Sequence, residues 1–326
     1  MRILVLLLPL CGSLACGPQT RAIPGPAVLP EHASCEGRPL GAGNHDRTLT
    51  HQERTRNYRL HVPPGYDATR PTPVVLAFHG FGSNEKSMGV LTHLSEEADA
   101  QGFLVVYARG LTAAELGREP EPGFGASGAW NSGVCCGAAR DVEVDDVGFV
   151  DTLLAELDTQ VCLDTKRVYA TGFSNGGFFS YRLACERSGQ FAAIAPVSGV
   201  ESATPCSPTR PVPVMHFHGT EDRTIEEQGG TASFLSGFYP AVSDVVARWV
   251  SRDGCTGEPS TTYQKGDSTC VSWQSCAQGA AVTRCSIQGG GHTWPGGPDI
   301  PGLGYTTKDL DATREMWRFF AAHPRP

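Results

Sequence analysis

Short apolar runs separated by helical patterns organise the first third of the chain. Residues 58–62 alternate between apolar and polar side chains as an edge strand does, and residues 74–78 form a continuous apolar run that is typical of a strand covered on both faces. A helical pattern over 84–101 is followed by another apolar run over 103–107. This β-α-β order predicts parallel strands.

The same alternation continues to the end of the chain. Residues 108–140 are the exception, because they carry Gly and Pro without a clear period and predict a long loop shaped for a binding face. The pattern predicts an α/β fold of one domain, with a mainly parallel sheet covered by helices on both faces. Further helices are expected from Asp145 or Asp146 to 161 and over 175–187 and 309–321, with strands over 168–171, 192–197, 212–217 and 282–287.

The first residues have the layout of an export signal. Met1 and Arg2 precede an apolar run over residues 3–10 and then small residues, and this run is too short to cross a bilayer as a stable helix. We expect a signal peptide over 1–16, a Pro/Gly-rich linker over 17–46 and a catalytic domain over 47–326. Because Cys16 follows Ser-Leu-Ala, two destinations stay open: secretion, or lipid anchoring through Cys16 at the bacterial cell envelope.

Composition and charge exclude several classes of partner. The chain has 326 residues, 40% of them hydrophobic, which is enough for one large core. Its formal charge of -8 and pI near 5.7 provide no basic field for nucleic acid or for an anionic membrane surface. We therefore expect no nucleic-acid partner, and membrane contact only through Cys16.

The cysteines predict disulfides rather than a metal site. Removal of the segment with Cys11 and Cys16 leaves ten of the 12 cysteines, an even number that suits an oxidising compartment. No C-x-x-C pair occurs, and adjacent cysteines at 135 and 136 cannot easily turn toward one tetrahedral ion. Two pairings are suggested only by position, Cys276 with Cys285 across a hairpin and Cys185 with Cys206 around a strand.

Residues 172–176 read Gly-Phe-Ser-Asn-Gly and match G-x-S-x-G, in which the serine stands on a tight strand-to-helix turn. The pattern alone is weak, because a Gly-rich turn with an exposed serine also matches it. Here a strand-like run precedes the motif and a helical run follows it, as the motif requires. Ser174 is the predicted nucleophile.

A serine hydroxyl needs a base and an acid that orients the base. His292 lies among five glycines after the run over 282–287, where packing gives little reason for a histidine, and it is the predicted base. Asp222 follows the run over 212–217 and is the predicted acid, with neighbouring Glu221 as its rival. The histidines at 79, 216 and 218 lie before or at strand ends, in the wrong order for the base.

Backbone donors must also meet the negative oxygen of a tetrahedral intermediate. The N–H of Asn175, directly after the serine, and the N–H of Phe81 in the turn after 74–78 are the predicted oxyanion donors. His79 is expected to shape that turn beside the oxyanion and is a candidate substrate-binding residue. Trp130 and Trp294 are candidates for stacking on a sugar or aromatic acyl group, against the alternative that they are packing residues.

Six blocks of residues together resemble the polyhydroxybutyrate depolymerase and feruloyl esterase family of secreted bacterial esterases. The resemblance runs from about residue 56 to 320 and implies a cofactor-free α/β-hydrolase whose triad falls on Ser174, Asp222 and His292. At position 81 the usual small residue is replaced by bulkier Phe81, which alters the acyl pocket. The blocks are His79–Ser83, Trp130-Asn131 with Cys135-Cys136, Val144–Phe149, Gly172–Gly177, His218–Asp222 and Gly291–Gly297.

These observations predict a serine-dependent carboxylic ester hydrolase that works through an acyl-enzyme, without metal or cofactor. The resemblance implies feruloyl or acetyl esters of plant polysaccharide, or hydroxyalkanoate polyesters, as substrates. Two alternatives stay open: a serine peptidase of the same fold, and a binding or adhesion module that has lost catalysis. Acyl and alcohol preference and oligomeric state are left open.

Overall fold

The computed structural model describes residues 29–32, 35, 38, 40–123, 128–202 and 205–326. The expected signal over 1–16, with Cys16, lies outside the described residues, as does much of the expected linker. Among the helices in the described part, none is long and apolar enough to cross a membrane.

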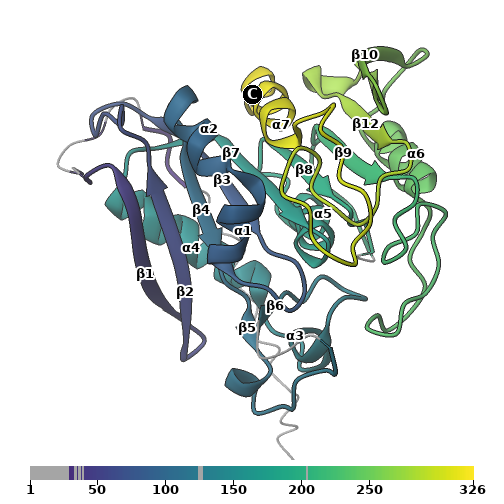
Figure 1. Ribbon diagram of the computed structural model, residues 1–326. Coiled ribbons are helices and arrows are strands. Elements are labelled where there is room, and N and C mark those ends of the chain that lie inside the picture. Colours follow the sequence, from purple (N-terminus) through teal and green to yellow (C-terminus); the bar gives the residue numbers. More distant parts are fainter. Residues whose placement is uncertain (1–28, 33–34, 36–37, 39, 124–127, 203–204) are drawn as a thin grey trace, which may run out of the picture.

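A ten-stranded sheet runs through the molecule, from the β1–β2 hairpin at one edge to β10 at the other (Figure 1). Its central strands β4, β3, β7, β8, β9 and β12 are parallel, and antiparallel strands complete both edges. In sheet order the strands are β1 (Gly43–His51), β2 (Arg54–Val62), β4 (Leu104–Ala108), β3 (Thr72–Phe78), β7 (Leu163–Phe173), β8 (Ala193–Val197), β9 (Val214–Gly219), β12 (Val282–Ile287), β11 (Ser268–Trp273) and β10 (Ser260–Lys265).

Helices cover both faces of this sheet, because the central strands direct apolar side chains to both sides. Every residue of β3 is buried, and its alternate side chains enter two separate hydrophobic clusters. The first cluster includes residues of α4 (Asp146–Gln160), α5 (Asn175–Glu186) and α6 (Val242–Arg252). The second includes residues of α1 (Glu85–Thr92), α2 (Leu94–Gln101) and α7 (Ala312–Ala322). The predicted fold class, a mainly parallel sheet between two helical layers in one domain, is confirmed.

The helix expected over 84–101 is divided into α1 and α2. Asn84 caps α1 by accepting from the backbone N–H groups of Lys86 and Ser87. His93 then adopts a left-handed φ of 52°, which ends α1 and starts α2 at the next residue. The apolar period continues through the break, so the pattern could not reveal it.

The region 108–140, predicted as a long loop, contains short elements. A two-stranded sheet pairs β5 (Leu111–Thr112) with β6 (Gly128–Ala129), and η1 (Ala114–Leu116) and α3 (Gly137–Asp141) lie on either side of it in sequence. The backbones of Gly110 and Gly128 approach so closely that a Cβ on Gly128 would overlap the carbonyl of Gly110. Backbone hydrogen bonds of Gly128 with Gly82 and Ser83 hold the segment beside the turn after β3.

The N-terminal arm is attached to the domain before the first strand begins. Cys35 forms a disulfide with Cys162, directly before β7, and His32 lies 2.8 Å from the Asp158 carboxylate on α4. β1 starts at Gly43, four residues earlier than the boundary expected at residue 47, and pairs with β2 over its whole length.

Five disulfides join all ten cysteines of residues 35–285, in agreement with the expectation of disulfides. Cys185–Cys206 forms as position suggested, but Cys276 pairs with Cys255 and not with Cys285. The reason is the strand register, which places Cys270 of β11 directly opposite Cys285 of β12. The remaining bonds are Cys35–Cys162 and the adjacent pair Cys135–Cys136.

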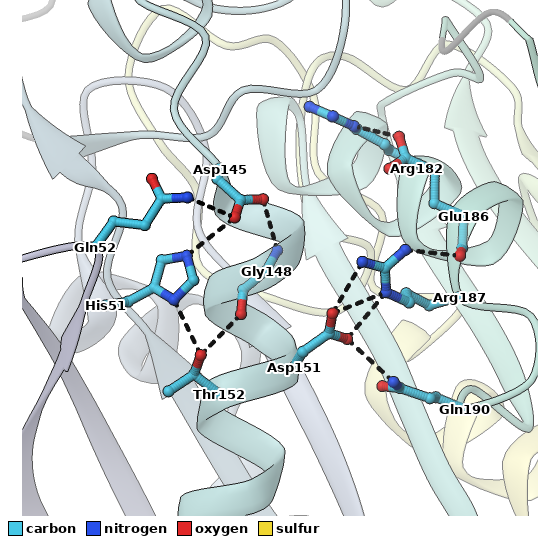
Figure 2. A network of polar contacts seen from close by, with 10 residues as sticks. All are labelled: His51, Gln52, Asp145, Gly148, Asp151, Thr152, Arg182, Glu186, Arg187 and Gln190. Carbon is cyan, nitrogen blue, oxygen red and sulfur yellow. Dashed lines mark hydrogen bonds and ion pairs between the residues drawn. The ribbon is translucent and has the colours of Figure 1, made fainter. Parts of the chain in front are cut away.

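Polar contacts fasten α4 to its neighbours (Figure 2). Asp145 caps α4 by accepting from the Gly148 N–H at 2.9 Å, and it also lies 3.1 Å from the imidazole of His51 at the end of β1. One turn later, Asp151 accepts from Arg187, the residue after α5, at 2.9–3.0 Å. The helix that follows Ser174 is therefore fixed at its far end by an ion pair to α4.

The disulfide network predicts a ranking of stability losses. In the chain-entropy picture, a cross-link stabilises more when it closes a longer loop. Cys35–Cys162 spans 127 residues and Cys255–Cys276 spans 21. We expect the double replacement by Ser to lower the free energy of unfolding by about 5 kcal/mol for the first pair and about 3 kcal/mol for the second. Urea denaturation of both variants measures this, and equal losses would contradict the ranking.

Candidate active site

The predicted chemistry-bearing residues follow the carboxyl ends of four parallel strands. His79 and Phe81 follow β3, Ser174 follows β7, Asp222 follows β9 and His292 follows β12. Because these strands are parallel members of one sheet, their carboxyl ends share one edge of it. Ligands of open α/β sheets bind at this edge, and it is where residues 213 positions apart in sequence come together.

Ser174 stands on a sharp turn between β7 and α5. Its φ of 53° and ψ of -117° lie outside the regions that L-residues ordinarily adopt. Its N–H donates to Val197 O at 2.9 Å, and its own carbonyl accepts from Phe178 N in the first turn of α5. The serine is 9% exposed, and this geometry is that of a nucleophile elbow.

Glycine is required on both sides of this turn. A Cβ on Gly172 would overlap the backbone of Gly176, and a Cβ on Gly176 would overlap the carbonyl of Phe78 at the end of β3. The G-x-S-x-G pattern therefore has a packing reason here, because the elbow lies directly against the neighbouring strand.

Asp222 and His292 are joined by a hydrogen bond. The Nδ1 of His292 lies 2.7 Å from Asp222 Oδ2, while Oδ1 accepts from the backbone N–H groups of Thr224 and Ile225 at 2.9 Å each. Since the carboxylate can only accept, His292 carries its proton on Nδ1 and leaves Nε2 as the basic nitrogen. The ring of Phe173, next to Ser174, packs 4.8 Å from the His292 ring.

The surroundings keep the Asp222 carboxylate ionised. Burial favours the neutral acid, but the electrostatic and hydrogen-bonding effects of His292, His218 and the Ile225 N–H exceed it, and the pKa of Asp222 is lowered. Its rival Glu221 is exposed, whereas Asp222 is 3% exposed. The geometry favours Asp222 as the partner of His292.

Backbone contacts hold the loops of Asp222 and His292 against each other. Thr220 N donates to Ile287 O and Glu221 N donates to Gly290 O, both at 2.9 Å, and Gly289 N donates to Thr220 Oγ1 at 2.8 Å. A Cβ on Gly219 would overlap the Gly290 carbonyl, so the glycines around His292 allow this approach. The histidine's place is thus set by the neighbouring loop.

His79 is buried in the turn after β3 and bonded within it, so it is not the substrate-binding residue that the sequence suggested. Its Nδ1 lies 2.8 Å from Gly80 O, and its Nε2 accepts from Gly110 N at 3.0 Å. Burial, together with the positive charges of Arg109 and Arg56, lowers the pKa of His79 to about 4. A neutral ring with both nitrogens bonded and 0% exposure is a structural element of the turn and offers no nitrogen to a substrate.

Trp130 does not offer the stacking surface for substrate that the sequence suggested. The side chain is 0% exposed, and its indole lies parallel to Phe179 with ring centroids 5.2 Å apart. Its indole N–H donates to His79 O at 3.1 Å, while its backbone N–H and C=O pair with the side-chain amide of Asn175 at 2.8 and 3.0 Å. Trp130 therefore links the turn after β3 to the turn after β7.

Trp294 is also buried, at 1% exposure, and belongs to the cluster beneath α1 and α7. Its indole N–H donates to Thr313 Oγ1 at 3.0 Å. Neither tryptophan presents a face to a substrate, so the packing alternative describes both. Sequence patterns could not separate the two readings, because the orientation of an indole depends on tertiary contacts.

Comparison with known proteins agrees with this architecture. Residues 56–227 match the family model described as "Esterase PHB depolymerase". A putative esterase of Nocardia uniformis, NocK, is 30% identical over 88% of this chain and 88% of its own length. Feruloyl esterase B of Piromyces equi is 28% identical over 73% of this chain, and this chain spans 42% of its length.

Solved structures share the fold. An acetyl xylan esterase from Aspergillus awamori superposes with a TM-score of 0.57 at 13% identity, covering 86% of this chain and all of its own. At 13% identity, the similarity shows the fold alone. The chain belongs to the esterase PHB depolymerase family of carboxylic ester hydrolases and has an α/β-hydrolase fold.

Proposed function

We propose that the chain hydrolyses carboxylic esters through a covalent acyl-enzyme on Ser174, with His292 as general base and Asp222 as the orienting acid. The observation that carries the proposal is the 2.7 Å bond from His292 to Asp222, together with the packing of the His292 ring 4.8 Å from the ring of Phe173, the residue before the serine of a strained elbow. These are the parts that activation of a weak hydroxyl nucleophile requires.

The proposed reaction has two halves. Ser174 Oγ attacks the ester carbonyl while its proton passes to Nε2 of His292, and the imidazolium is stabilised by ionised Asp222. When the tetrahedral intermediate collapses, His292 returns the proton to the departing alcohol and the acyl group remains on the serine. Water, activated by the same histidine, then releases the carboxylic acid and restores the hydroxyl.

We assign the negative oxygen of the intermediate to the N–H groups of Asn175 and Phe81. Asn175 is the first residue of α5, so its N–H has no acceptor within the helix and stands at the positive end of the helix dipole. The side-chain amide of Asn175 is committed to Trp130, Ser132 and Cys135, which supports a role for its backbone alone. Trp130 holds both donor turns at a fixed separation.

We propose an aromatic acyl group, of the feruloyl type, as the preferred acid component. The ring of Phe81, in the donor turn, lies 6.3 Å from the ring of Phe234, and a Cβ on Gly137 would meet the Phe81 ring at 2.8 Å. An apolar, aromatic wall next to the carbonyl site favours a flat apolar acyl chain. The relatives include feruloyl esterases and a bifunctional acetylxylan esterase/xylanase, so the aromatic side chains carry this choice.

We propose that the protein works outside reducing compartments, because five disulfides suit an oxidising environment. We propose export by the segment 1–16, followed by either release or lipid anchoring at Cys16. Polysaccharide or polyester is the proposed source of the ester, and the proposed route uses protein side chains without a cofactor.

The peptidase and binding-module alternatives make different predictions about Ser174. A fluorophosphonate probe labels an activated serine and not a merely exposed one, so labelling separates both enzyme readings from a binding module. We expect the intact protein to be labelled and to release p-nitrophenol from p-nitrophenyl acetate. Ser174→Ala should abolish both signals, a loss of at least about 10³-fold in kcat. Full activity in this variant would refute the assignment.

A substrate panel tests the acyl preference. We expect kcat/KM for methyl ferulate to exceed that for hydroxybutyrate oligomers and acetylated xylan, and Phe81→Ala to reduce the ferulate rate by about 10-fold or more, since an aromatic contact would be lost. The p-nitrophenyl acetate rate serves as control in the same variant. Faster turnover of acetyl or hydroxybutyrate esters would contradict the aromatic preference and leave the esterase assignment intact.

The two buried tryptophans provide a matched pair for the oxyanion assignment. Trp130→Phe removes the indole N–H that holds His79 O, and we expect kcat to fall by about 10- to 100-fold with little change in KM, because the donor turns act on the transition state. Trp294→Phe removes an equally buried indole N–H from the other cluster. Steady-state kinetics of both variants should show the kcat effect for Trp130 only, and equal effects would contradict the role of Trp130.

A further inference from the structure

A hydrogen-bond chain of buried polar side chains leads from α5 to the carboxylate of Asp222. The proposed mechanism does not use this hydrogen-bond chain. The hydroxyl of Tyr181 lies 2.9 Å from His216 Nδ1, and His216 Nε2 lies 3.2 Å from His218 Nδ1. His218 Nε2 lies 2.7 Å from Ile225 O and 3.6 Å from Asp222 Oδ2. None of these side chains is more than 3% exposed.

The hydrogen-bond partners in this chain determine which nitrogen of each histidine carries the proton. Ile225 O can only accept, so His218 carries its proton on Nε2, and its Nδ1 is an acceptor while the ring is neutral. His216 must then donate from Nε2, which leaves its Nδ1 to accept the proton of Tyr181. Every donor in the hydrogen-bond chain therefore points in the same direction, toward the loop of Asp222.

Burial keeps the three groups in the uncharged forms that this arrangement needs. The pKa of His216 is lowered well below its ordinary value, first by burial and then by neighbouring His218 and Arg284. Burial also lowers the pKa of His218, against the opposing effect of Asp222, and raises the pKa of Tyr181 well above its ordinary value. The other charged or titratable groups that act on His218 are His292 and Glu227.

We propose that Tyr181, His216 and His218 form a one-directional hydrogen-bond chain that fixes the Asp222 loop and turns the positive end of an N–H bond toward the Asp222 carboxylate. His218 acts at two points of one turn, since Ile225 accepts from its ring and Ile225 N–H donates to Asp222 Oδ1. It is a positioning residue, acting through Asp222 on His292. The inference rests on the proposed esterase function.

The hydrogen-bond chain has a consequence for the pH profile of kcat/KM. The N–H dipole of His218 offsets part of the negative charge of Asp222, and this reduces how strongly Asp222 holds a proton on His292. If that dipole is removed, the imidazolium of His292 is held more firmly. The acid limb of the kcat/KM profile, which reports loss of the neutral base, must then move to higher pH.

Two amide substitutions separate the donor from the acceptor of His218. In His218→Asn the side-chain oxygen takes the place of Nδ1 and still accepts from His216, but the donor near Asp222 is lost. In His218→Gln the amide nitrogen takes the place of Nε2 and keeps that donor. We expect His218→Asn to lower kcat between about 10- and 100-fold and to move the acid limb upward, whereas His218→Gln keeps the limb in place and restores part of kcat.

Variants at the other two members of the hydrogen-bond chain complete the test. His216→Asn removes the next donor, and we expect a smaller movement of the limb in the same direction. Tyr181→Phe should lower the thermal midpoint, because His216 Nδ1 is left unsatisfied, without moving the limb. If the limb stays at the native pH in both Asn variants, the proposal is overturned. An inactive native protein would instead refute the proposed function, so the two failures are distinguishable.

Discussion

The hydrogen bond between His292 and Asp222 is the interaction on which the proposed chemistry depends, and it exists because β9 and β12 are adjacent and parallel. Parallel neighbours bring their carboxyl ends to one edge, and three hydrogen bonds between the two following loops then place the imidazole over the carboxylate. The glycines around the histidine serve this approach. Without that strand pairing, residues 70 positions apart would have no reason to meet.

Much of the fold could be predicted from the periodicity of apolar residues. The strand expected over 282–287 agrees with β12, and the alternation of strands and helices correctly indicated a parallel sheet. The helix α6 was missed, although its buried residues Val242, Val245, Val246 and Trp249 have helical spacing that could have revealed it. The pairing of Cys276 was wrong because register, which places Cys270 beside Cys285, is a tertiary property.

The candidate site could be predicted where local geometry constrains the sequence, and could not where contacts between distant segments decide. Ser174 was predicted from the glycines that the elbow requires, and Asp222 from its place after a strand. The tryptophans are different. Whether an indole faces solvent or links two turns depends on which neighbours surround it, and Trp130 is enclosed by His79 from the turn after β3 and by Asn175 and Phe179 from α5.

The disulfide between Cys35 and Cys162 has a consequence for the order in which the fold assembles during synthesis. Because synthesis starts at the N-terminus, the first thiol is present 127 residues before the second. Cys35 therefore keeps a free thiol until the residues of β1 to β4 and α4 have been added. Cys135 and Cys136 precede Cys162 in the chain and pair with each other, so the native bonds form only if Cys35 pairs with the last of these three thiols.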